Sequence, residues 1–162
     1  MNNIIFLDID GVLTSEQNDI KNQEYYTNMY RLLQETKDSE LILKLMDIDI
    51  EKIYMLKEVC NITKAKIVIT STWKNNIIYP LVEEQLINRG LPIIDTTPYI
   101  NNKRGEEIRA FLRKNKVDNY VILDDDIFED FNELIYDLIR TTYYGEGLTE
   151  DNCEEIVKRF KK

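Results

Sequence analysis

The feature that most constrains the fold is a series of short, largely apolar runs with helical patterns between them. Asn3–Leu7 and Lys66–Ile69 are the clearest, and residues 120–123, 92–94 and 137–141 extend the series to five. Runs that do not alternate between apolar and polar residues are typical of parallel strands covered on both faces. Strands that alternate with helices predict an α/β fold: a doubly wound, mainly parallel five-stranded sheet with helices on both faces.

Four helical patterns separate or follow these runs. One helix begins after Asp49, which can cap it, and another follows Pro80 and stops at Gly90. A third pattern covers residues 106–116, and the tail forms a fourth helix that Thr149 can cap. At 162 residues the chain has room for one domain, so residues 1–162 are expected to form a single unit.

The connection between the first two strands is longer than a simple crossover needs. Within it, residues 25–46 carry a stripe of Tyr26, Met29, Tyr30 and Leu33 at helical spacing, which predicts a face packed on the core. Residues 15–48 are therefore expected to form a small helical flap or minimal cap insertion. This segment is shorter than the roughly 40 residues at which a unit usually folds alone. We expect it to lie on the edge of the core and to leave the site open.

Composition excludes several classes of protein. The chain has no histidine, which removes Ser–His–Asp hydrolysis and histidine-ligated zinc. A net charge of −9 argues against a broad nucleic-acid-coating surface but not against a small basic site. No apolar stretch is long enough to span a bilayer, and no signal peptide is recognisable, so no membrane partner is expected. Cys60 and Cys153 are too few for a disulfide framework, and a cytoplasmic location is expected.

Acids and hydroxyls follow three of the predicted strands. Asp8 and Asp10 follow the first, Thr70 and Ser71 the second, and a run that begins with Asp124 and Asp125 the fourth. In open parallel sheets, ligands bind at the carboxyl ends of the strands. Carboxylates gathered there repel one another, and a hard divalent cation such as Mg²⁺ is the usual compensation. The sequence therefore predicts a metal-dependent acidic site.

The segment D-I-D-G-V-L-T at residues 8–14 resembles the first motif of the haloacid dehalogenase-like (HAD) phosphohydrolase superfamily. A calcium-binding EF-hand loop does not fit, because Gly11 stands at the fourth position and a strand precedes it. I-V-I-T at residues 67–70 is similar to the second motif, and V-I-L-D-D at residues 121–125 to the fourth. Lys103 and Arg104 both fit the third.

More narrowly, several segments resemble the HAD domain of Swiss-army-knife RNA-repair proteins. They are I-V-I-T-S-T-W-K (67–74), R-G-E-E-I-R-A-F-L (104–112), V-I-L-D-D-D (121–126) and G-L-T (147–149). The resemblance implies a HAD-like Rossmannoid core and a Mg²⁺-dependent phosphatase. It also implies a phosphorylated substrate, with a nucleotide or a nucleic-acid end favoured. No obligate protein partner is evident.

The resemblance also implies residue roles. Asp8 would attack phosphorus to form an aspartyl-phosphate, and Asp10 would serve as general acid and base. Mg²⁺ would be held by Asp8, by the main-chain carbonyl of Asp10, and by Asp125 with Asp124 beside it. Thr70 would bind a phosphoryl oxygen, and Lys103 or Arg104 would supply the neutralising cation. Ser71, Lys74 and Arg104 are further substrate-binding candidates.

Three alternatives remain open from the sequence. The substrate can be a small phosphorylated metabolite, or the chain can be an inactive HAD-like binding module. A receiver-like signalling domain is disfavoured, because its acceptor Asp would follow a middle strand, where Thr70-Ser71-Thr72 stands instead. Trp73, the sole tryptophan, is expected to pack, with stacking on a base or sugar as the other reading.

Overall fold

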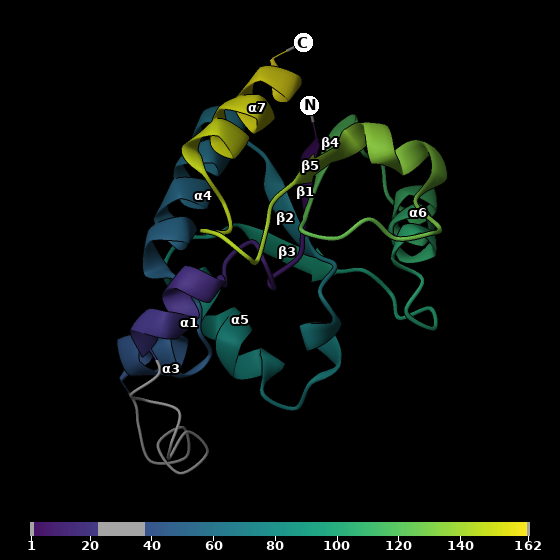
Figure 1. The fold of residues 1–162 in the computed structure, drawn as a ribbon. Coiled ribbons are helices and arrows are strands. Elements are labelled where there is room, and N and C mark those ends of the chain that lie inside the picture. The colour runs from purple at the N-terminus through teal and green to yellow at the C-terminus, as the bar shows by residue number, and fades with distance from the viewer. Residues whose placement is uncertain (1, 23–37, 162) are drawn as a thin grey trace.

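The computed structural model describes residues 2–22 and 38–161. Its centre is a five-stranded, all-parallel sheet in the order β3-β2-β1-β4-β5, which confirms the predicted fold class (Figure 1). The bounds are β1 Asn3–Leu7, β2 Lys66–Ile69, β3 Ile93–Thr96, β4 Asn119–Asp124 and β5 Leu138–Arg140. All five predicted strands therefore exist.

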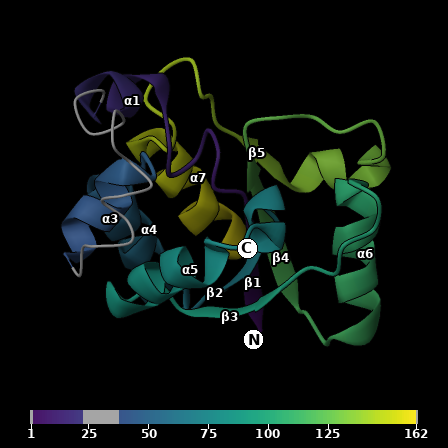
Figure 2. The same cartoon turned by 90° about the horizontal axis from the view of Figure 1, so that it is seen from below.

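Two helical layers cover the two faces of the sheet (Figures 1 and 2). One apolar cluster joins the sheet to α4 (Ile50–Thr63), α5 (Tyr79–Asn88) and α7 (Glu150–Phe160). A second cluster joins the opposite face to α6 (Arg104–Lys114) and the short 3₁₀ helix η3 (Asn132–Asp137). Each strand must be apolar on both sides to serve two clusters, and all five residues of β1 are buried.

The helix starts depend on local capping chemistry. Asp49 accepts a hydrogen bond from the Glu51 amide at the start of α4, and Thr149 forms a capping box with Asn152 at α7, as predicted. The helix predicted over residues 106–116 begins two residues earlier, at Arg104. Its N-cap residue, Lys103, makes no side-chain cap hydrogen bond, so the sequence carries no start signal there.

The insertion after β1 is helical where it is described. It contains α1 (Glu16–Asn22) and α3 (Ser39–Leu45), and the Asn18 amide donates to the Asp47 carbonyl at 2.8 Å. Leu43 of α3 belongs to the core cluster, so this helix packs on the core (Figure 2). The predicted stripe of Tyr26, Met29, Tyr30 and Leu33 lies outside the described residues. The division into a core and a flap over residues 15–48 stays a prediction.

A short 3₁₀ helix, η2 (Thr72–Asn75), follows β2 directly and leads toward α5. Within the described ranges, the search for membrane spans found no helix that is both long and apolar enough to cross a bilayer.

Candidate metal-dependent active site

Strand register brings the candidate residues to one edge of the sheet. Leu7, the last residue of β1, pairs with Ile69 of β2 and with Leu123 of β4. The next residue on each strand path is Asp8, Thr70 or Asp124, so these three side chains stand level at the carboxyl edge. Backbone bonds hold them there: the Asp8 amide donates to Leu123 at 2.9 Å, and the Thr70 amide donates to Leu7 at 2.8 Å.

The turn after β1 explains the glycine of the first motif. Gly11 has a φ of +65°, which L side chains rarely adopt, and its amide donates to Thr14 Oγ1 at 3.1 Å. A Cβ atom built on Gly11 would lie 2.3 Å from Asp125 Cγ. Only glycine therefore lets the turn pass directly beside the acid of the fourth strand.

Three carboxylates converge at this edge. Asp8, Asp124 and Asp125 each offer an oxygen, and the three oxygens all lie within 4.8 Å of one another. Burial raises the pKa of Asp124 well above the ordinary carboxyl range, and the charge of Asp8 raises it further. The same two causes raise the pKa of Asp125. An all-oxygen donor set under mutual repulsion fits a hard divalent cation.

Arg104 is the cation that reaches this cluster. Its Nη1 atom lies 2.5 Å from Asp124 Oδ2, 3.5 Å from Asp8 Oδ2 and 3.3 Å from Thr70 Oγ1. The guanidinium carbon stands 4.8 Å from the centre of the Phe128 ring. Lys103, the other candidate for the third motif, is exposed. In the described structure the buried contacts belong to Arg104.

Asp10 lies at the rim and is held by Trp73. The indole Nε1 donates to Asp10 Oδ2 at 2.8 Å, while the ring packs against the core. Desolvation of the Asp10 carboxyl and the nearby charge of Asp8 raise its pKa, and the Trp73 hydrogen bond opposes them. The packing role predicted for Trp73 is confirmed, but its bond to Asp10 was not foreseen, since 63 residues separate the pair.

Lys74 and Ser71 have internal partners. Lys74 Nζ lies 2.6 Å from Glu107 Oε2 and 2.7 Å from Thr97 Oγ1, and burial lowers its pKa. Ser71 is buried, and its hydroxyl accepts from the Trp73 amide at the start of η2. The roles of Lys74 and Ser71 in substrate binding therefore stay predictions.

Glu107 was missed at the level of sequence. It follows Arg104 by three residues on α6, a spacing that places both on one helix face, and this spacing was the available signal. Its other oxygen accepts from the Ile100 amide at 2.9 Å, which ties the loop before α6 to the same network. Glu107 thus links the loop after β3, the helix that carries Arg104, and Lys74.

The comparisons with known proteins agree with this arrangement. Residues 4–153 match the family described as "HAD domain in Swiss Army Knife RNA repair proteins". A search of curated proteins and a search of solved structures each returned no match. The family match spans the whole sheet and every residue of the acidic cluster. The chain therefore belongs to the family of HAD domains found in Swiss Army Knife RNA repair proteins.

Proposed function

We propose that this HAD domain is a Mg²⁺-dependent phosphatase that hydrolyses a phosphomonoester through an aspartyl-phosphate on Asp8. The observation that carries the proposal is the convergence of Asp8, Asp124 and Asp125 beside the guanidinium of Arg104. This edge offers oxygen ligands for a dication and a positive group for a phosphoryl oxygen. Both are needed to bring a dianionic phosphate to a carboxylate nucleophile.

The proposed reaction has two displacements at phosphorus. A carboxylate oxygen of Asp8 attacks phosphorus, the bond to the leaving oxygen breaks, and Asp10 gives its proton to that oxygen. Water then attacks the phosphorus of the aspartyl-phosphate and passes a proton to Asp10. Inorganic phosphate leaves, and Asp8 and Asp10 regain their starting forms. Thr70 and Arg104 bind phosphoryl oxygens in both steps.

Asp8, the Asp10 carbonyl, Asp124 and Asp125 would hold the Mg²⁺ ion, whose charge offsets the repulsion between phosphate and carboxylates. In the metal-free protein Arg104 supplies part of this compensation. The raised pKa values of Asp124 and Asp125 support the need for a further cation, because each carboxylate is disfavoured in its charged form.

For the substrate we propose a nucleic-acid end or a nucleotide. The support is the family, whose description names RNA repair. Activity on a 3′- or 5′-phosphorylated oligonucleotide, compared with the matching mononucleotide, tests this choice. A preference of about tenfold or more in kcat/KM for the mononucleotide would favour a small metabolite instead.

The decisive experiment is turnover of p-nitrophenyl phosphate by the wild type and by Asp8→Asn, with and without Mg²⁺. We expect Mg²⁺-dependent release of phosphate by the wild type and no measurable turnover by the variant, because an amide is a far weaker nucleophile. A folded wild-type protein that turns over neither this substrate nor the oligonucleotides would identify an inactive binding module. Activity retained by Asp8→Asn would remove Asp8 as the nucleophile.

The two acids after the fourth-strand core are separable by metal titration. We expect Asp125→Ala to raise the Mg²⁺ concentration needed for half-maximal activity more than Asp124→Ala does. In the structure Asp124 is fully buried against Arg104, whereas Asp125 is half-buried and its carboxyl faces Gly11. Unchanged titrations for both variants would place the metal elsewhere.

A further inference from the structure

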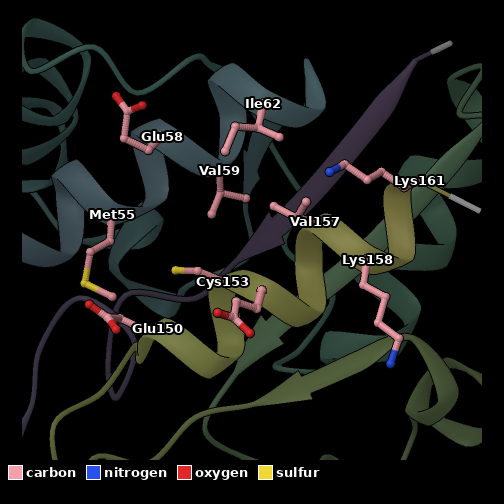
Figure 3. Close-up of a pocket in the computed structure, with 10 residues that line it drawn as sticks. Met55, Glu58, Val59, Ile62, Glu150, Cys153, Val157, Lys158 and Lys161 are labelled. Carbon is pink, nitrogen blue, oxygen red and sulfur yellow. The ribbon is translucent and has the colours of Figure 1, made fainter.

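A groove runs along the outer face of the α4–α7 layer, away from the candidate active site. The two helices lie side by side on the sheet (Figure 1), and the groove between them has a volume of about 750 Å³. Val59, Cys153 and Val157 form its middle in Figure 3, with Met55 and Ile62 toward its two ends. Its lining is therefore apolar along the length of both helices.

This apolar stripe faces solvent. Ile62 keeps 57% of its surface exposed, and it belongs to neither core cluster. Met55, Val59 and Ile62 follow one another at spacings of four and three residues, so they share one face of α4. Helices that cover a sheet normally turn polar residues outward. A continuous apolar groove on the outer face is the type of surface that binds another protein surface.

The charged residues around the groove are segregated by sign. Glu58, Glu150 and Glu154 lie toward the Met55 end, whereas Lys158 and Lys161 lie toward the Ile62 end (Figure 3). Lys158 is 3.8 Å from Glu155, but this pair is exposed to water and so holds the lysine only weakly. The groove therefore has an acidic half and a basic half along one axis.

A surface with this polarity is complementary to itself. Rotation by a two-fold axis through the middle of the groove reverses its direction, so the acidic half of one copy meets the lysines of the other. The apolar middles then meet on the axis, as the symmetry of an isologous dimer requires. A parallel arrangement would place like charges together. We propose that the groove binds a second copy of this chain, with the two α4–α7 pairs antiparallel.

The expected dimer is reversible. At 1.5 Å per residue the 14 residues of α4 span about 21 Å, and two helix widths cover about 20 Å. The projected face is thus about 400 Å² per copy, below the roughly 800 Å² per partner of a standard stable interface. Self-association should therefore depend on concentration within the micromolar range rather than be permanent.

Sedimentation velocity from about 1 to about 200 µM tests the proposal. We expect the wild type to shift from monomer toward dimer over this range. Ile62→Glu should remain monomeric, and it should fold because Ile62 is exposed. Thermal melts of each variant confirm that it is folded. A wild type that stays monomeric throughout would overturn the proposal.

Charge reversal provides the sharper arm. The pair Lys158→Glu/Lys161→Glu and the pair Glu58→Lys/Glu154→Lys should each abolish self-association. A mixture of the two variants should restore a dimer. Glu150 is left unchanged, because an acid in the first turn stabilises α7.

The matched control is Lys114→Glu/Lys116→Glu, which changes two exposed lysines at the end of α6. Each lysine pair changes the net charge by −4, from −9 to −13, so both variants carry the same total charge. We expect the control to dimerise as the wild type does. Equal disruption by the control, or failure of the folded mixture to associate, would reject the antiparallel groove.

Discussion

Removal of Arg104 gives the strongest test of the acidic cluster. Met keeps a long apolar stem but removes the charge from a side chain that is only 4% exposed. Two buried carboxylates, those of Asp124 and Asp8, then lose their cation. Removing one partner of a buried ion pair costs about 3–5 kcal/mol. A protein of this length loses about 2–4 °C per kcal/mol, so we expect the Tm of metal-free Arg104→Met to fall by roughly 6–20 °C.

The loss should depend on pH and on metal. Protonated carboxyl groups need no cation, so the difference from the wild type should shrink at about pH 5 and grow at about pH 8. A divalent cation bound by the same carboxylates replaces part of the missing charge. Mg²⁺ should therefore raise the Tm of Arg104→Met, since any ligand that binds only the folded state stabilises it.

The neighbouring lysine is the matched control. Lys103 is exposed, and Lys103→Met should change the free energy of unfolding by no more than about 0.5 kcal/mol. Differential scanning fluorimetry and urea denaturation measure both variants, with and without Mg²⁺. Equal losses for the two substitutions would refute the reasoning, because the effect would then not depend on the buried contacts of Arg104.

Three further predictions concern the same edge of the sheet. Gly11→Ala should raise the Mg²⁺ concentration needed for activity by about tenfold, because its Cβ would displace Asp125; an unchanged titration would contradict this. Native Asp124 holds its proton more tightly than an unfolded carboxyl with a pKa of 3.8. Metal-free wild type should therefore lose stability as pH rises above that value, and Asp124→Asn should flatten the decline in urea denaturation. Trp73→Phe removes the donor to Asp10 and should lower kcat/KM for p-nitrophenyl phosphate by about ten- to a hundredfold with the fold intact; wild-type kinetics would exclude a positioning role.

Local physical chemistry made the framework of the fold predictable from sequence. The bounds of β1 and β2 match the apolar runs at Asn3–Leu7 and Lys66–Ile69, because a strand buried on both faces must be apolar along its length. Asp49 and Thr149 mark helix starts through hydrogen bonds to nearby amides. Such signals lie within a few neighbouring residues and can be read without tertiary context.

Element ends without a local signal were predicted less well. The third strand was expected over residues 92–94 but extends to Thr96, through residues that are polar and only partly covered. The start of α6 was placed late because Lys103 provides no cap. Pairing with β2 extends β3, and contacts across the site hold Arg104, so tertiary interactions decided both ends.

The sequence by itself determined that acids and hydroxyls gather at the carboxyl ends of parallel strands. Parallel topology brings the residues that follow each strand to one edge. Only the tertiary structure decided the partners: Arg104 rather than Lys103 reaches Asp124. It likewise paired Lys74 with Glu107. The physical reason is that charged groups choose partners by distance and desolvation, and these depend on strand register and helix placement across the fold.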